Sequence, residues 1–330
     1  MNAFPQRTGG SLHIVASEPR YGLSLLEVIV VLAIIGLVLS ISLPAILSAK
    51  ASSKTLECSN RLRQVSIAIT NYHDQHGQTP PNGSMYLALL PYIEQAGLAE
   101  LLAENPPENI NRNGGTLWWE GEVTVYACPS EITPARGIDA TTNYCMNHGV
   151  LRIFDVSGGF NLDGDGFPNR FRDVLDGLSN TAMISEKSLE PAAQQFDGSG
   201  YDVCIQNPRR FGFWRVNTAY DVPDEGILFD AACNNIAFSP DTYITRGFPT
   251  GGITVTDRLY MHTIRPNSPN CGNGIEAGNP WSDFATEPAS SYHPGGINLG
   301  LGDNSVRFIS DNIDLSTWRA FGTRSRGETM

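Results

Sequence analysis

The chain has 330 residues and a formal net charge of −12, from 22 Lys and Arg against 34 Asp and Glu. Nucleic-acid binding depends on clustered basic side chains that displace counterions, so this acidic chain without a basic run is not expected to bind nucleic acid. A hydrophobic content of 41% is enough for a sizeable core, while 33 glycines, 21 prolines and only 17% charged residues favour a turn-rich body with β structure over a helical bundle.

The first predicted element is an apolar helix near the N-terminus. Residues 21–49 contain no Lys or Arg, and residues 25–47 are almost wholly apolar apart from Glu27, Gly36, Pro44 and a few serines. About 20 such residues span a bilayer as a helix. Arg7 and Arg20 precede the run, which favours a cytoplasmic N-terminus. We therefore expect a single-pass anchor in the inner membrane with the C-terminal domain outside the cytoplasm.

Glu27 needs an explanation, because a carboxylate costs about 3 kcal/mol at the bilayer centre and less toward the edge. One interpretation is a plain anchor whose Glu27 lies in the headgroup region. The other rests on the stretch Gly22-Leu23-Ser24-Leu25-Leu26-Glu27-Val28-Ile29, which resembles the recognition stretch of type IV prepilins. The resemblance implies cleavage between Gly22 and Leu23 by a prepilin peptidase, methylation of the new Leu23 amine, and pairing of Glu27 with the N-terminal amine of a neighbouring subunit. Leu23 stands where the family usually has Phe.

The apolar helix is predicted to continue past Pro44, with a kink or local loosening, as an amphipathic segment. Cys58, Leu62, Val65, Ile69 and Tyr72 recur at spacings of 4, 3, 4 and 3, which places them on one helical face. This face is expected to pack against the globular domain, and glycine and proline after residue 76 end the helix. The predicted divisions are a leader at 1–22, the helix at 23–76 and a β-rich domain at 77–330.

The C-terminal segment predicts a β-hairpin. Apolar and polar or small residues alternate over 297–301, a turn follows, and residues 306–309 form a second short apolar strand. Asp303 and Asn304 are residue types that suit the positive backbone angles of a tight turn.

His293 lies ten positions before Asp303, and the segment from His293 to Asn304 resembles the motif of a prepilin-associated family named for H-x9-DG. Asn304 replaces the glycine of that motif. The resemblance implies a pilin-like α+β fold, in which a long N-terminal helix packs on a mostly antiparallel sheet, and groups the chain with type II secretion pseudopilins, but it implies no activity for the globular domain. The other stretches that resemble the family are residues 57–64, 71–74, 90–95, 128–130 and 176–181.

His293 and Asp303 could also form an acid/base pair or part of a metal site. A histidine oriented by a carboxylate is found in acid/base pairs and in metal sites. The simpler interpretation, which we favour, is that both side chains satisfy backbone groups around the hairpin. The sequence contains none of the common nucleophile, zinc-protease or phosphate-loop motifs.

A second candidate site is acidic. Asn161, Asp163 and Asp165 are followed by a glycine with the spacing that opens an EF-hand calcium loop. Arg172 occupies the position of the closing glutamate, although the adjacent Asp173 could close a looser calcium site. The alternative is an acidic surface turn without a cofactor.

Six cysteines are spread along the chain without a CxxC pair, and they allow 15 disulfide connectivities. Disulfides are plausible in an exported protein. Cys58 and Cys128 both lie in stretches that resemble the family, and a bridge between them is the preferred pairing; free buried cysteines are the alternative.

The leading hypothesis is a non-enzymatic pseudopilin or pilin-like structural subunit of a type II secretion or type IV pilus-like system. Its expected partners are a prepilin peptidase, other pilin-like subunits, the inner-membrane platform and the membrane. Two alternatives remain open. One is an anchored extracytoplasmic protein that binds a polysaccharide or another secreted substrate, and the other is an anchored hydrolase that uses His293 and Asp303.

Overall fold

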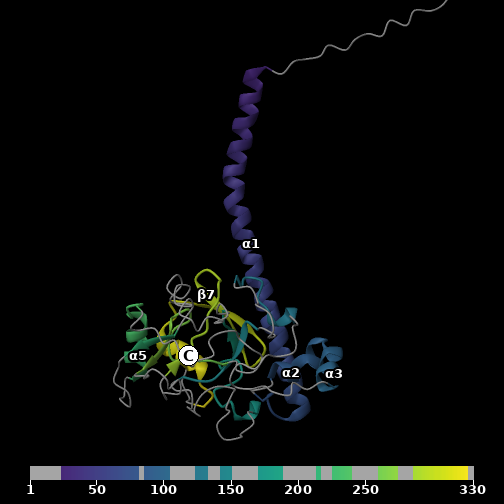
Figure 1. Ribbon diagram of the computed structural model, residues 1–330, viewed down its shortest axis with the longest axis vertical. Helices are drawn as coiled ribbons and strands as arrows, with labels where there is room; N and C mark the ends of the chain where they lie inside the picture. The colour runs from purple at the N-terminus through teal and green to yellow at the C-terminus, as the bar shows by residue number, and fades with distance from the viewer. Residues whose placement is uncertain are drawn as a thin grey trace, which may run out of the picture. The chain divides into compact units, whose positions relative to one another are not determined.

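The computed structural model describes residues 24–81, 85–104, 123–132, 142–150, 170–188, 213–216, 225–239, 259–273 and 285–325. The chain forms two compact units, Met1–Lys50 and Ala51–Met330. Helix α1, Leu25–His76, contributes to both of them (Figure 1).

In the first unit, α1 begins with a capping box. The Ser24 Oγ accepts a hydrogen bond from the Glu27 backbone N–H at 3.3 Å, and the Glu27 carboxylate accepts one from the Ser24 N–H at 2.8 Å. The helix continues through Pro44, and its large apolar side chains are exposed from Leu25 to Leu47. Among the described residues, α1 is the helix that is long and apolar enough to cross a membrane.

In the second unit, the amphipathic part of α1 has the predicted face. Cys58, Leu62, Val65 and Ile69 are completely buried, and Tyr72 packs partly buried at the edge of the same cluster. The helix ends where Gly77 adopts a positive φ of 73°, which glycine accommodates without steric cost. The predicted stripe and the end of the helix are therefore confirmed.

The buried face of α1 lies against a five-stranded sheet with the order β4-β1-β2-β7-β8. Tyr144 and Met146 of β1 join the core beside α1, whereas Cys145 between them joins the core beside α6 on the opposite face. The β1/β2, β2/β7 and β7/β8 pairs are antiparallel. The short strand β4 pairs in parallel with β1 at one edge of the sheet. The strands are β1 Tyr144–Asn147, β2 Ala182–Glu186, β4 Leu259–Tyr260, β7 Gly296–Leu301 and β8 Val306–Ser310, and α6 is Leu315–Gly322.

Shorter elements complete the second unit. Helices α2 and α3 lie beside the C-terminal turns of α1 (Figure 1), where Met85 and Leu89 join its core. A three-stranded sheet, β3-β5-β6, packs with α5 around a separate apolar cluster. The bounds are α2 Met85–Leu89, η2 Leu90–Ile93, α3 Ala96–Glu104, η3 Thr124–Tyr126, η4 Phe171–Asp173, α5 Glu225–Asn234, β3 Phe213–Val216, β5 Asn270–Asn273 and β6 Ala285–Thr286.

The α+β fold class is confirmed: a long N-terminal helix packs on a mostly antiparallel sheet. The predicted hairpin is β7 and β8, paired from Gly296 with Ser310 to Gly300 with Val306. In its turn Asn304 has a φ of 66°, whereas Asp303 does not adopt a positive φ. Only one of the two turn residues therefore has the backbone angle that the sequence suggested for both.

Candidate functional site

The two named residues of the H-x9-D motif lie in different surroundings. His293 precedes β7 and is 2% exposed. Asp303 is exposed in the turn after β7, where its carboxylate accepts hydrogen bonds from the backbone N–H and the hydroxyl of Ser305. The structure therefore does not bring His293 and Asp303 together as an acid/base pair.

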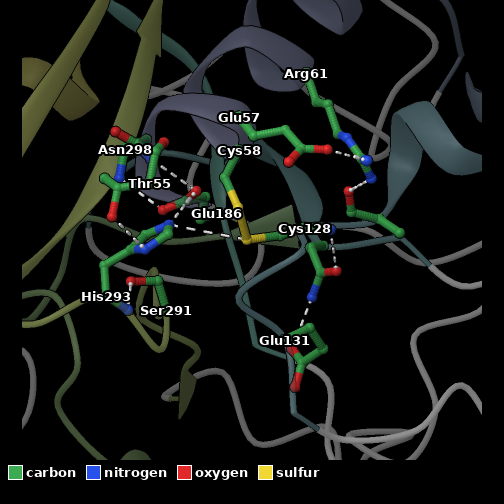
Figure 2. The surroundings of a disulfide bond; sticks show 12 residues. Thr55, Glu57, Cys58, Arg61, Cys128, Glu131, Glu186, Ser291, His293 and Asn298 are labelled. Atoms are coloured by element: carbon green, nitrogen blue, oxygen red, sulfur yellow. Dashed lines mark hydrogen bonds and ion pairs between the residues drawn. A yellow bond between two sulfur atoms is a disulfide. The ribbon is translucent and has the colours of Figure 1, made fainter. Parts of the chain in front are cut away.

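The carboxylate that meets His293 is Glu186, the last residue of β2, which is 1% exposed. The His293 Nε2 lies 3.0 Å from Glu186 Oε1 (Figure 2). Asn298 of β7 donates to the same carboxylate twice, from its backbone N–H at 2.7 Å and from Nδ2 at 2.9 Å. The Glu186 carboxylate oxygens are acceptors in both bonds from Asn298, and with His293 Nε2 as a third donor the buried carboxylate is fully hydrogen-bonded.

The second ring nitrogen of His293 contacts α1. Its Nδ1 lies 3.0 Å from Thr55 Oγ1, which is also 3.1 Å from the Ala51 carbonyl oxygen. The Thr55 hydroxyl has one proton, so it cannot donate to both acceptors at once. Both contacts are satisfied when His293 Nδ1–H donates to Thr55 and Thr55 donates to Ala51.

A disulfide lies directly beside this pair. Cys58 of α1 is bonded to Cys128, 70 residues later in the chain, and the Cys128 Sγ lies 3.8 Å from His293 Nε2. The structure thus contains the bridge that the family resemblance suggested. The other cysteines among the described residues, Cys145, Cys233 and Cys271, are buried thiols.

Side chains of Arg61 and Asn143 hold the backbone around Cys128 independently of the disulfide. The Arg61 guanidinium donates to the Thr124 and Ala127 carbonyl oxygens at 2.7 and 2.8 Å. The Asn143 Oδ1 accepts from the Cys128 N–H at 2.8 Å. On the opposite side, the Tyr144 hydroxyl donates to the Cys58 carbonyl oxygen at 3.1 Å, and burial raises the pKa of Tyr144 well above its usual value.

The far end of β7 contacts α1 through different residues. The Thr70 hydroxyl donates to Asn304 Oδ1 at 3.0 Å, and the Arg63 Nε donates to the Asn304 carbonyl oxygen at 3.2 Å. Between the two ends, a Cβ placed on Gly300 would lie only 3.0 Å from Ser66 Oγ, so glycine permits the close approach of strand and helix. The segment from His293 to Asn304 therefore runs along α1 from Thr55 to Thr70.

The remaining predicted site residues are not gathered here. Glu27 is exposed on the first unit, where its described hydrogen bonds are to Ser24. Asp173 is at the end of η4, half exposed, with its carboxylate 3.8 Å from the Arg172 Nε. Gly22, Leu23, Asn161, Asp163 and Asp165 lie outside the described residues, so the cleavage site and the possible calcium loop stay predictions.

Sequence reasoning missed Glu186, Thr55 and Asn298, which complete the surroundings of His293. Glu186 comes directly after the apolar strand residues of β2, and a charged residue at the end of a buried strand is the one local signal that could have drawn attention to it. Thr55 and Asn298 have no such signal, because polar residues on a helix and a strand are usually solvent-facing.

Two segments of the sequence match family models. The model of a family described as "Protein of unknown function (DUF1559)" matches residues 48–316. The model described as "Prokaryotic N-terminal methylation motif" matches residues 19–43, which include the stretch around Gly22 and Glu27. Comparison with curated proteins and with solved structures gives no match.

Proposed function

Because the chain belongs to the DUF1559 family of proteins of unknown function and carries the prokaryotic N-terminal methylation motif, we propose that it is a pilin-like structural subunit of a type II secretion or type IV pilus-like system. A prepilin peptidase cuts after Gly22, and the new Leu23 amine is methylated. Helix α1 then anchors the chain in the inner membrane, with the second unit on the extracytoplasmic side. No catalytic role is assigned to the protein itself.

The observation that carries this proposal is the match to the methylation motif at the start of an apolar helix. Side chains from Leu25 to Leu47 are mostly more than half exposed, which is unfavourable in water but suits lipid or the apolar helices of neighbouring subunits. Such a helix supports both membrane storage of the subunit and packing with like subunits.

The capping box gives Glu27 a second role that must be separated from its charge. A glutamine at this position can keep the cap, because its side-chain oxygen also accepts from the Ser24 N–H, but it cannot form an ion pair with a neighbouring amine. Glu27→Gln therefore tests the charge alone, whereas Glu27→Ala removes both the charge and the cap.

The experiment expresses wild type, Glu27→Gln and Glu27→Ala in cells with the complete secretion or pilus machinery. Mass spectrometry of the N-terminus should show a methylated Leu23 in wild type. The Glu27→Gln chain should also be cleaved, but filaments sheared from the cells should contain much less of it than of wild type. An uncut Met1 chain, or cleavage elsewhere, would contradict the assignment. Incorporation of Glu27→Gln at wild-type levels would rule out the charge-pairing role.

A basic pocket supports the second candidate, an anchored binding protein. A cavity of about 340 Å³ is lined by His73, His76, Gly77, Gln78, Arg170 and Arg172. The His73 Nε2 accepts from the Phe171 N–H at 3.2 Å, which leaves its Nδ1 to carry the proton. In an acidic chain, two arginines at one cavity favour an acidic ligand such as a uronate-containing polysaccharide, to which the His73 Nδ1–H adds a hydrogen-bond donor.

Calorimetric titration with oligogalacturonate distinguishes this candidate. If it is correct, Arg170→Ala should weaken binding about tenfold or more, whereas Arg324→Ala, outside the pocket, should not. Absence of binding by wild type would remove the candidate and leave the structural role.

A further inference from the structure

Four metal-ligating side chains meet beside the disulfide. The ligand atoms of Cys58, Cys128, Glu186 and His293 all lie within 4.8 Å of one another, and each residue is at most 7% exposed. They come from α1, from the segment after η3, from the end of β2 and from the start of the β7 hairpin, so the fold gathers them from four separate parts of the chain. Figure 2 shows the His293 ring directed at both Glu186 and the disulfide sulfurs.

The geometry suits tetrahedral zinc. Zn²⁺ binds cysteine sulfur at about 2.3 Å and histidine nitrogen or carboxylate oxygen at about 2.0 to 2.2 Å, so neighbouring sulfur and nitrogen ligands lie about 3.5 Å apart and nitrogen and oxygen about 3.3 Å. Here the Cys128 Sγ lies 3.8 Å from His293 Nε2, which lies 3.0 Å from Glu186 Oε1. Shifts of a few tenths of an ångström would centre a metal between these three atoms, and after reduction the Cys58 and Cys128 sulfurs would also have to move apart to about 3.8 Å to bind the same ion.

The surroundings also resemble those of metal ligands. A metal-bound histidine is usually oriented by a hydrogen bond to its other ring nitrogen, and Thr55 provides this partner for His293 Nδ1. A ligating carboxylate is likewise held by hydrogen bonds, and Asn298 donates two to Glu186. Both ligands are therefore oriented before any metal binds.

The two cysteines remain in place without their covalent bond. Cys58 is fixed by helix α1, and the Cys128 backbone is held by Asn143, while Arg61 ties the preceding carbonyls to the same helix. Reduction would thus leave both sulfurs beside Glu186 and His293. Two thiolates next to a buried carboxylate would repel one another, and a divalent cation removes this repulsion.

We propose that Cys58, Cys128, Glu186 and His293 form a redox-gated zinc site, in which Zn²⁺ binding and the disulfide are mutually exclusive states. A dithiol reductant transfers two electrons and two protons to the disulfide, which yields two thiols and an oxidised cyclic disulfide of the reductant. Zn²⁺ then displaces the two thiol protons and the proton on His293 Nε2. Oxidation of the thiolates by a disulfide-bearing oxidant releases the metal and restores the bridge.

The site would connect the helix to the sheet in oxidising and in reducing compartments. Disulfides form in oxidising compartments and are rare where thiols are kept reduced. In a reducing compartment the metal would join α1 to the segment containing Cys128, and after oxidation the covalent bond would replace it. The connection between helix and sheet is then present in either state. The proposal does not depend on filament assembly.

Cobalt provides the test, because tetrahedral thiolate coordination gives intense ligand-field bands and a sulfur-to-cobalt charge-transfer band. The full chain is purified in detergent with a phosphine reductant and titrated first with Co²⁺ and then with Zn²⁺. We expect one equivalent of Co²⁺ with these bands, displacement by Zn²⁺, and no bands after oxidation to the disulfide. Cys58→Ser should abolish the charge-transfer band of this site, and His293→Ala should weaken binding about tenfold or more.

Cys145→Ser is the matched control, since Cys145 is a buried thiol on the neighbouring strand outside the cluster. A second measurement uses wild type alone: Zn²⁺ should slow alkylation of Cys58 and Cys128, as mapped by peptide mass spectrometry, without changing Cys145. Absence of tetrahedral bands in the reduced wild type would overturn the proposal. Equal binding by the oxidised protein, or protection of other cysteines instead, would overturn it as well.

Discussion

The Glu186–His293 pair gives the sharpest test of how the hairpin is held to the rest of the domain. Both side chains are almost completely buried, and the His293 Nε2 lies 3.0 Å from the Glu186 Oε1. Glu186→Gln removes the charge with little change of volume and places an amide against donors on His293 and Asn298. Changing one partner of this buried hydrogen-bonded group leaves donors on the other residues unsatisfied, and each such donor costs about 1 to 3 kcal/mol.

We therefore expect Glu186→Gln and His293→Gln each to lower the free energy of unfolding by about 3 kcal/mol or more. The double variant should lose less than the sum, with a coupling energy of at least about 1 kcal/mol, because the second change has no pair left to break. Urea unfolding of the full chain in detergent, with the disulfide intact, can follow the fluorescence of the buried Trp214 and Trp318.

Asp303→Asn is the control from the same motif. Its carboxylate is exposed, and its hydrogen bonds within the described residues are to Ser305, so we expect a loss of no more than about 1 kcal/mol. Additive effects of the two glutamine variants would refute the coupling between Glu186 and His293. A loss for Asp303→Asn equal to that for His293→Gln would refute the claim that the ends of the motif act separately.

Three further predictions concern the packing of β7 and α6. Gly300→Ala should cost about 1 to 3 kcal/mol, because its Cβ would lie 2.9 Å from Ile184 Cγ2 and 3.0 Å from Ser66 Oγ, whereas Gly97→Ala in open space should be neutral or stabilising in urea unfolding. Asn304→Ala should lose about 1 to 3 kcal/mol through its positive φ and the lost Thr70 bond, but Asn304→Gly, which removes the strain, should be clearly less destabilised. Burial lowers the pKa of His262 to about 3, so the unfolded chain binds a proton below about pH 6.5 that the folded chain excludes. The free energy of unfolding should then fall by about 1.4 kcal/mol per pH unit from about 6.5 toward 3, and His262→Gln should flatten this slope in urea titrations at several pH values.

The sequence predicted the elements whose signal is local. The stripe from Cys58 to Ile69 follows the helical period, and the alternation of β7 follows the strand period, so both could be read from neighbouring residues. The end of α1 was equally readable from Gly77. In contrast, the order of the five strands depends on pairings between distant segments, such as β2 with β7, that no local pattern specifies.

The partner of His293 could not be predicted for the same reason. Asp303 was the candidate because it belongs to the same motif, yet six residues of extended strand span about 20 Å and separate the two positions. Glu186 lies 107 residues before His293, and only the β2/β7 pairing brings it close. A strand predicted between two candidate residues should therefore count against a direct contact between them.

The same geometry explains what a fixed spacing between His293 and Asn304 achieves. Thr55 and Thr70, which meet the two residues, are 15 positions apart on α1, and 15 helical residues rise about 22 Å. Strand β7 with its flanking turn residues covers a similar length. Shortening the segment by one residue would shift the strand by about 3.3 Å and reverse the faces of every side chain beyond the deletion. Asn298 would then leave Glu186, or Asn304 would leave Thr70, because the register of β7 along α1 sets the position of both residues. The spacing is thus better explained by the length of the helix that the hairpin must follow than by chemistry between its two ends.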